Sequence, residues 1–301
     1  MKYYLSILVL IFFLIGCKNN SYEDSLFENI PVSSNSEIKF NSLKLERIEL
    51  DKIQSSLNGV LLIKNDTLIF FDTSFSRAFL FDRDGNFIES SLGVGPGPNE
   101  IPNRSMRFID QKPDGSIVLI GNSNDYHIID SDFNRLKSSA IRWQGNHPLE
   151  YLRNNPTPTD QRAYDLAYNM GNMKVMGNYA YLPLASAPPP FSEYNLTTDL
   201  FAREARIAAK MNLETGDVEE IIGRLSPVYH QNKNARTFSF YNMAKDVKKR
   251  LFYVTYRPDS LIYVKDENFN PIRAFGFQGR NINANYKLFP ASNNVETLSA
   301  H

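Results

Sequence analysis

The sequence predicts an all-β protein, specifically a β-propeller built from four-stranded antiparallel blades. The composition is the first observation, because 21 Phe and 16 Tyr residues favour strands, on which aromatic rings pack well. The second is the pattern beyond residue 37, where short apolar or alternating runs are separated by Asp, Asn, Gly and Pro. The third is that these runs recur in groups of four within about 40–50 residues, the length of a propeller blade.

Four such units follow one another along the chain. They span residues 59–90, 107–137, 173–218 and 238–275, and the third is the loosest copy. A blade has two apolar faces that it cannot bury alone, so stacking blades around an axis is the expected arrangement. A β-sandwich is the alternative, because short strands can align by chance.

The turn between the third and fourth strands is the best-preserved part of the unit. It reads Asp82-Arg-Asp-Gly-Asn86, Asp130-Ser-Asp-Phe-Asn134 and Asp266-Glu-Asn-Phe-Asn270. We expect the Asp to accept backbone N–H groups and the Asn to adopt the left-handed conformation of a tight hairpin. Calcium loops are a poorer interpretation, because the twelve-residue spacing and the bidentate Glu are absent.

The number of units sets the expected domain boundaries. The units occupy residues 59–280, and Ile38–Leu50 reads as an extra strand that could close a ring by completing the last blade. We therefore expect the propeller at 38–301 to be six-bladed when complete and truncated here, with a complete four- or five-bladed ring as the alternative. Two insertions, roughly Trp143–Asn172 and Ser186–Glu204, interrupt the repeat, and long loops often carry function.

The N-terminus predicts a lipoprotein signal. An apolar run from Tyr3 to Ile15 ends in Leu14-Ile-Gly-Cys17, which resembles the lipobox of bacterial lipoproteins. Residues 1–16 are then the signal peptide, Cys17 is lipidated, and 17–37 form a polar linker. Several acyl chains would hold the protein on a membrane far more firmly than one. An uncleaved N-terminal anchor is the alternative.

Charge and composition exclude several classes of function. Lys+Arg and Asp+Glu both number 33, so the chain lacks the basic excess of a nucleic-acid-binding protein. The single Cys excludes a disulfide framework. The four His residues have no metal-ligand spacing, and no Gly-x-Ser-x-Gly element is present. We therefore assign no metal, no cofactor and no catalytic residue.

A glycine-rich segment carries a resemblance to a known family. Phe81-Asp-Arg-Asp-Gly-Asn-Phe87 is followed by Gly93-Val-Gly-Pro-Gly97, an order similar to that of the six-bladed β-propeller lipoproteins of Bacteroidota, which are related to NHL-repeat and TolB-like propellers. Two departures are Val94, where a basic residue is usual, and an acid that comes only at Glu100. The resemblance implies a fold and a place in the cell envelope, on the outer membrane, and no particular reaction. By itself the segment reads as a stiff turn.

Blade geometry indicates where a ligand would bind. The connection between strands two and three and the connection to the next blade lie on one face, which also holds both insertions. The charged and aromatic candidates on that face are Arg77, Arg104, Asp125, Trp143, Arg257 and Asp259. Arginines can grip a carboxylate or phosphate bidentately, and aromatic residues such as Trp143 and Tyr194 can stack on a sugar. Solvated surface loops are the alternative.

Together these features predict a lipid-anchored binding module of the cell envelope, periplasmic or surface-exposed, whose partner is a peptide, a protein or a glycan. The rival is a propeller lyase or lactonase-like hydrolase that acts on a carbohydrate or related metabolite with a divalent ion. Such an enzyme would need acids facing inward from the first strands, where only Asp110 and Asp246 are available.

Overall fold

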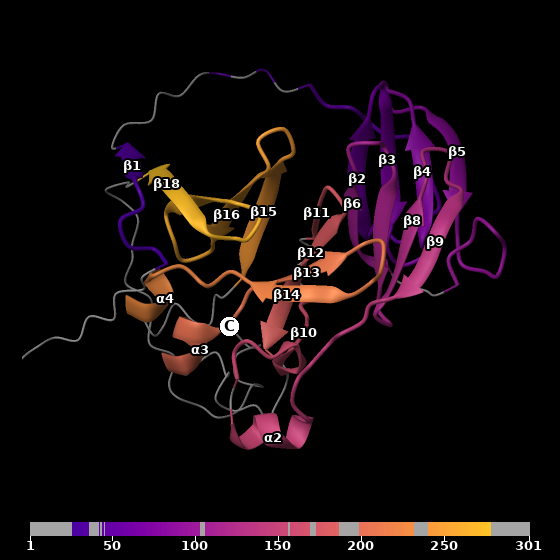
Figure 1. Cartoon of the computed structure of the whole chain (residues 1–301). Coiled ribbons are helices and arrows are strands. Elements are labelled where there is room, and N and C mark those ends of the chain that lie inside the picture. The colour runs from indigo at the N-terminus through magenta and orange to yellow at the C-terminus, as the bar shows by residue number, and fades with distance from the viewer. Residues whose placement is uncertain are drawn as a thin grey trace, which may run out of the picture.

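The chain folds into four antiparallel sheets that follow one another as the blades of a propeller (Figure 1). The computed structural model describes residues 26–35, 42, 44, 46–102, 106–155, 157–168, 173–186, 199–231 and 240–277. Blades 1 and 2 comprise β2 (Gly59–Lys64), β3 (Thr67–Asp72), β4 (Arg77–Phe81) and β5 (Phe87–Leu92), then β6 (Met106–Gln111), β7 (Ile117–Gly121), β8 (Asp125–Ile129) and β9 (Arg135–Ala140). Blade 3 comprises β10 (Tyr164–Leu166), β11 (Lys174–Met176), β12 (Tyr179–Ser186), β13 (Ala208–Asn212) and β14 (Val218–Ile222), and blade 4 comprises β15 (Tyr241–Asp246), β16 (Leu251–Tyr256), β17 (Leu261–Lys265) and β18 (Pro271–Phe277).

Burial explains why these segments become strands. Strand β7 is buried along its whole length, as its continuous Ile-Val-Leu-Ile run requires. The outer strand β9 alternates between partly buried and exposed residues, as a strand at the rim of a sheet does. The predicted all-β class and the four-stranded antiparallel blades are confirmed.

The core lies between the blades in two clusters. One cluster joins the facing sides of blades 1 and 2, with Phe71, Ile109 and Leu119 among its members. The larger cluster joins blades 2, 3 and 4 and contains Phe108, Tyr181 and Phe252. Along the axis, β11 contacts both β6 and β15, so the inner strands of three blades meet there.

The inner strand of blade 3 differs from expectation. Two short strands, β10 and β11, both pair with β12, and the first insertion places β10 there. The sequence repeat indicates only β11, because β10 lies within the first insertion, which interrupts the repeat.

A strand lies ahead of the segment where the extra strand was predicted. Strand β1 (Val32–Asn35) pairs in parallel with β18 at the outer edge of blade 4, within the segment expected to be a linker. No strand is present among the described residues of the 38–50 segment where it was expected, namely 42, 44 and 46–50. The prediction followed the alternating apolar pattern there. The described residues 46–50 lead to blade 1, where the Asp51 N–H donates to the Gly85 carbonyl oxygen at 2.9 Å.

The turns that begin with Asp82, Asp130 and Asp266 confirm that the Asp accepts backbone N–H groups, but the prediction that the Asn is left-handed was wrong. In all three turns the Asp Oδ1 accepts the N–H groups two and four residues on, and Oδ2 accepts the Asn side-chain amide, at 2.7–3.2 Å. The left-handed residue is the one before the Asn: Gly85 (φ 93°), Phe133 (φ 62°) and Phe269 (φ 62°). Left-handed backbone is costly for Phe. Burial of both Phe rings offsets that cost.

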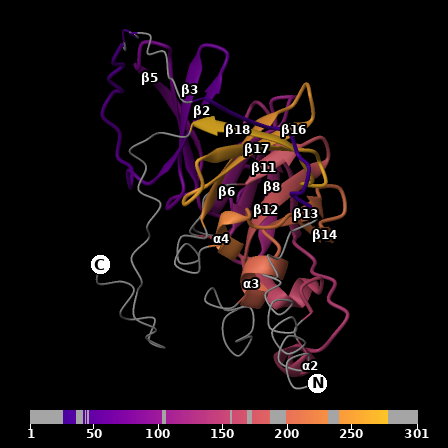
Figure 2. The ribbon, with the colours of Figure 1, turned by 90° about the vertical axis from the view of Figure 1, so that its left-hand side faces the viewer.

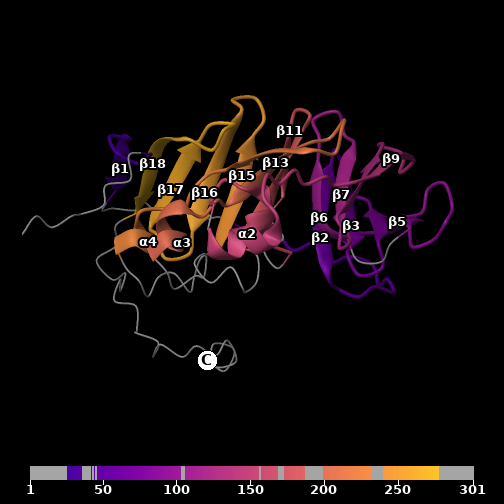
Figure 3. The ribbon, with the colours of Figure 1, turned by 60° about the horizontal axis from the view of Figure 1, so that its bottom comes forward.

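The strand directions define two faces of the propeller. The turns between strands one and two and between strands three and four form what we call the turn face. The other connections form the loop face, which carries α2 (Leu149–Asn154), the 3₁₀ helix η1 (Gln161–Ala163), α3 (Asp199–Glu204) and α4 (Val228–Gln231). Figure 3 shows the three α-helices in a row along this side of the sheets. Figure 2 shows the same helices grouped below the sheets from another direction.

Candidate functional site

The candidate residues on the loop face are spread over several blades. Arg77 begins β4 and Asp125 begins β8, whereas Arg257 and Asp259 lie between β16 and β17. Trp143 lies in the first insertion, and Arg104 and Tyr194 fall outside the described residues. The five candidates that the structure describes therefore come from blades 1, 2 and 4 and from the first insertion.

The charged candidates of blade 4 mostly shape their own turn. The Arg257 guanidinium lies over the Phe240 ring, 4.7 Å from its centroid. Asp259 accepts the Leu261 N–H at 3.0 Å and the Tyr263 hydroxyl at 2.9 Å. Burial, together with the Asp259 charge, raises the pKa of Tyr263 well above its usual value. Arg77 belongs to blade 1, where it begins β4.

Asp125 holds a buried histidine. Its Oδ2 lies 2.9 Å from His127 Nε2, while His127 Nδ1 lies 2.7 Å from Ser138 Oγ. His127 is only 2% exposed. The three side chains cross-link β8 to β9 within one sheet, which is the work of a structural network.

Trp143 lines a hollow of about 290 Å³ on the loop face, between blades 2 and 3. Its other lining residues are Asn124, Leu149, Gln161, Arg162, Tyr164 and Asp165. Trp143 is half-buried and packs against the large core cluster, so its ring is held in place rather than free to move. Asn124 comes from the turn directly before Asp125, and the others come from the first insertion.

Hydrogen bonds hold the floor of this hollow. Gln161 is buried, accepts the Gln144 N–H at 2.7 Å and donates to the Val218 carbonyl oxygen at 2.8 Å. The Tyr164 hydroxyl donates to the Pro158 carbonyl oxygen at 2.9 Å, and burial raises the pKa of Tyr164 to about 12. Hydrogen bonds therefore hold the Gln161 side chain in place, and the Tyr164 hydroxyl stays protonated at neutral pH.

Asp160 organises the loop around the hollow. Its side chain is 1% exposed, and its oxygens accept the N–H groups of Asn146, His147 and Arg162 at 2.9–3.1 Å. His147 Nδ1 also lies 2.9 Å from Asp160 Oδ2. Burial alone would raise the pKa of Asp160, but these hydrogen bonds outweigh it and the pKa falls below its usual value. The carboxylate is thus ionised when it holds the loop.

The remaining groups give the hollow a mixed chemistry. Trp143 and Leu149 supply apolar surface, while Asn124, Arg162 and Asp165 are exposed and carry an amide, a guanidinium and a carboxylate. A ring that has one apolar face and hydroxyl groups around its edge suits such a surface. The sequence points only to Trp143, because Arg162 and Asp165 come from an insertion that has no repeat to reveal them and Asn124 is one polar residue of the β7–β8 turn.

The axis of the propeller holds an ion pair. Lys245 on β15 donates to the Asp110 carboxylate on β6, to the Gln111 carbonyl oxygen at 2.7 Å and to the Val175 carbonyl oxygen at 2.9 Å. Asp110 also accepts the Val175 N–H at 2.6 Å. Asp110 is one of the two inward acids expected on the first strands. It lies in blade 2 and contacts Val175 of blade 3 and Lys245 of blade 4, so it links three blades.

Asp246, the other expected acid, accepts the Lys249 N–H at 3.0 Å in the turn that follows β15. Among the residues that the structure describes, no group of three or more His, Cys, Asp and Glu side chains is placed to hold a metal ion.

Comparison with known proteins identifies the fold. No family model matches the chain, and no curated protein matches it in sequence. A solved member of the DUF4221 family from Bacteroides vulgatus is similar, with a TM-score of 0.51 and 15% identity over 78% of this chain and 62% of that protein. This chain therefore spans less than two thirds of that protein. BamB from Moraxella catarrhalis gives a TM-score of 0.33 and 12% identity, with 73% of this chain and 63% of that protein covered.

The four sheets packed side by side place the molecule among the β-propeller proteins. The likeness to the Bacteroides vulgatus protein concerns the fold alone at that identity. Within the described residues, no helix combines the length and the apolar character needed to cross a membrane.

Proposed function

We propose that this protein is a lipid-anchored β-propeller of the bacterial cell envelope that binds a glycan through the Trp143 hollow on its loop face. The observation that carries the proposal is the half-buried Trp143 ring beside the exposed polar side chains of Asn124, Arg162 and Asp165. The anchor rests on the sequence Leu14-Ile-Gly-Cys17, which lies outside the described residues.

A sugar fits this hollow better than an extended peptide does. The apolar face of a pyranose ring can stack on an indole ring, and its hydroxyl groups can both donate and accept hydrogen bonds. The hollow offers groups of both kinds, because Asp165 accepts, Arg162 donates and the Asn124 amide does both. A volume of about 290 Å³ matches one or two sugar units rather than a long chain.

The binding test uses a feature peculiar to this chain. Trp143 is its one tryptophan, so intrinsic tryptophan fluorescence reports on the hollow alone. We expect members of a glycan array that bind the full chain to shift or quench this fluorescence in a saturable way. Arg162→Ala and Asp165→Ala should weaken binding, each by on the order of tenfold, because each removes a hydrogen bond to a charged group.

Trp143→Ala removes the aromatic ring of the hollow and should abolish binding. Its matched control is Phe87→Ala, which removes an exposed aromatic ring from blade 1, where Phe87 is 42% exposed. It should leave glycan binding unchanged. Glycan binding that survives Trp143→Ala, measured by calorimetry on a variant with unchanged circular dichroism, would exclude this hollow. A peptide array that binds through the same residues when no glycan does would transfer the site to a peptide ligand.

The anchor has a separate test. Full-length protein expressed in a lipoprotein-processing bacterium should incorporate labelled palmitate, and Cys17→Ala should abolish the incorporation. Palmitate labelling that persists in Cys17→Ala, or is absent from the wild type, would contradict the anchor without bearing on the glycan site.

A further inference from the structure

The first insertion carries a second aromatic surface beside the Trp143 hollow. The His147 imidazole and the Tyr151 ring stack on each other, with their centroids 4.5 Å apart and their planes 13° apart. Both rings reach solvent, because the His147 side chain is 37% exposed and Tyr151 is 44% exposed. We call this stacked pair the α2 platform, because Tyr151 lies in α2 and His147 lies shortly before it.

A buried carboxylate fixes the orientation of the α2 platform. His147 Nδ1 lies 2.9 Å from Asp160 Oδ2, and the Asp160 side chain is 1% exposed. Asp160 Oδ2 also accepts the His147 N–H at 3.0 Å, so the imidazole is held through its ring and through its backbone. Tyr151 thus stacks on a ring that is already fixed. A ligand that covers the Tyr151 ring therefore costs little additional side-chain entropy.

The α2 platform and the Trp143 hollow are neighbours on the loop face. Leu149 lines the hollow, is 52% exposed and lies between His147 and Tyr151 in the chain. The Arg162 guanidinium, which also lines the hollow, donates to the His147 carbonyl oxygen at 3.3 Å. Trp143 precedes His147 by four residues, so their Cα atoms are at most about 14 Å apart. A chain of a few sugar units can therefore reach from the hollow to the platform.

We propose that the α2 platform is a second sugar-binding subsite, so that the loop face binds a linear oligosaccharide rather than a single sugar. The inference rests on the proposed glycan site, in which one ring stacks on Trp143, and adds that a later ring of the same ligand stacks on Tyr151. The hollow, at about 290 Å³, holds only one or two sugar units, so the rest of a longer ligand must lie outside it.

The exposed Tyr151 ring suits such a contact. An aromatic side chain with one apolar face in reach of a ligand and a polar hydroxyl in water can cover the apolar face of a pyranose ring without burying an unpaired polar group. The second contact is made within a ligand that is already bound, so it raises the affinity without any enlargement of the hollow.

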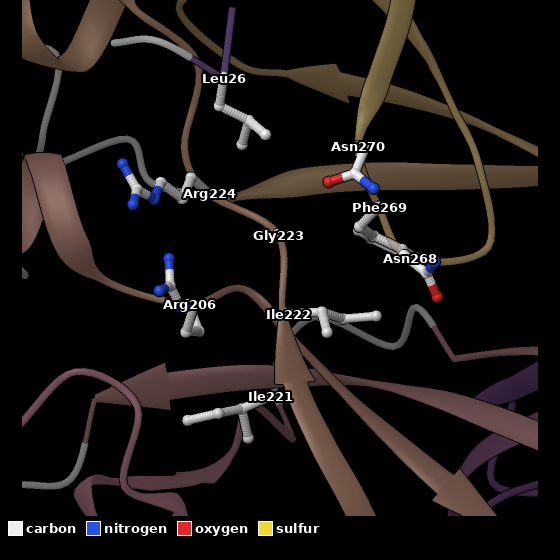
Figure 4. Close-up of a pocket in the computed structure, with 9 residues that line it drawn as sticks. All are labelled: Leu26, Arg206, Ile221, Ile222, Gly223, Arg224, Asn268, Phe269 and Asn270. Atoms are coloured by element: carbon white, nitrogen blue, oxygen red, sulfur yellow. The ribbon is translucent and has the colours of Figure 1, made fainter.

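A hollow at the perimeter of the propeller lacks these features and provides the comparison. It has a volume of about 430 Å³ and lies between the end of β14 and the β17–β18 turn (Figure 4). Among the described residues that line it, the aromatic one is Phe269, which is fully buried and packs on Tyr181 and Phe252. Its lining therefore offers a sugar no exposed aromatic face, although its volume is larger.

The dependence of binding on ligand length tests the subsite. A glycan array that presents each structure as chains of one to six sugar units is probed with the full chain, and the affinity for each bound series is measured by calorimetry. We expect the affinity to rise by on the order of tenfold between chains that only fill the hollow and chains that also reach Tyr151, as one added aromatic contact does.

Variants of Tyr151 separate the two contacts. Tyr151→Ala should abolish the gain with length but leave the affinity for the shortest bound chain unchanged, and that unchanged affinity also shows that the hollow is still folded. Tyr151→Phe keeps the ring and should keep the gain. Trp143→Ala should abolish binding at every length. Asn268→Ala removes an exposed amide from the perimeter hollow and should change neither the affinity nor its dependence on length.

Each outcome bears on one of the two sites. Equal affinity for short and long chains overturns the α2 platform but leaves the Trp143 hollow standing. A gain with length that survives Tyr151→Ala, or that is lost in Asn268→Ala, assigns the longer chain to another surface and also overturns the platform. Absence of binding at every length overturns the glycan site itself, and the platform with it, so the two failures are distinguishable.

Discussion

The turn face and the loop face of this propeller are built on different rules. On the turn face, three blades repeat one five-residue turn in which a single Asp side chain accepts the same set of hydrogen bonds. On the loop face, the connection between blades 2 and 3 supplies most of the Trp143 hollow. Hydrogen bonds made within a turn can therefore be repeated from blade to blade, whereas the Trp143 hollow lies where the repeat is interrupted.

The largest effect is expected from the axial ion pair, near the turn-face end of the inner strands. Lys245→Met should lower the free energy of unfolding by about 3–5 kcal/mol, because it leaves the Asp110 carboxylate, 12% exposed, without its charge partner. Urea unfolding, followed by circular dichroism, measures this loss in the free energy of unfolding. Lys248→Met, in the exposed turn after β15, is the control and should change little. Equal stability of the two variants would show that the pair does not hold the blades together.

The next effect compares glycines on the turn face. Gly85→Ala should destabilise the fold strongly, because the new Cβ would lie 2.2 Å from the Glu49 carbonyl oxygen and φ is 93°. Gly177→Ala also has positive φ, at 59°, but meets no atom within 4 Å, so it should cost only about 1 kcal/mol. A smaller loss of stability for Gly85→Ala than for Gly177→Ala in urea unfolding would refute the contact between Glu49 and the blade 1 turn.

A third prediction concerns the loop face. Asp160→Asn should weaken ligand binding at the Trp143 hollow by on the order of tenfold, because one amide cannot replace a carboxylate that accepts several N–H groups. The melting temperature should fall less than for Gly85→Ala, since the loop lies outside the blades. Fluorescence titration and thermal unfolding of the same sample measure both. Binding that is unchanged while the melting temperature falls would assign Asp160 to the fold rather than to the site.

The smallest effect is a pH dependence of the turns. Hydrogen bonds from Asn86 and Asn134 lower the pKa of Asp82 and Asp130 below the usual value. Their contribution to stability is therefore present above the unfolded pKa, about 3.9, and is lost as the pH falls through the folded pKa. Asp82→Asn with Asp130→Asn should be less stable than wild type near neutrality and converge with it in acid. A difference in urea midpoint that stays constant down to about pH 2 would contradict this origin.

Much of the fold could be predicted because its signals are local. The repeated strands and the Asp-initiated turns rest on alternation and on hydrogen bonds that span four residues. The left-handed position escaped prediction, because Phe133 and Phe269 occupy it only by virtue of the core that buries their rings. The candidate site was predictable only through Trp143, whose aromatic ring stands out in the sequence, whereas Asn124, Arg162 and Asp165 are ordinary surface residues.

The amino-acid sequence by itself determined the all-β class, the four-strand repeat and the turns, because each depends on residues that are neighbours in the chain. The tertiary structure alone decided that β1 pairs with β18, that Lys245 reaches Asp110, and that Arg206 and Arg224 share a pocket with Leu26. Lys245 and Asp110 are 135 positions apart, and no local pattern encodes such a contact. These contacts exist because stacking the blades buries their apolar faces, which brings distant segments to the same place.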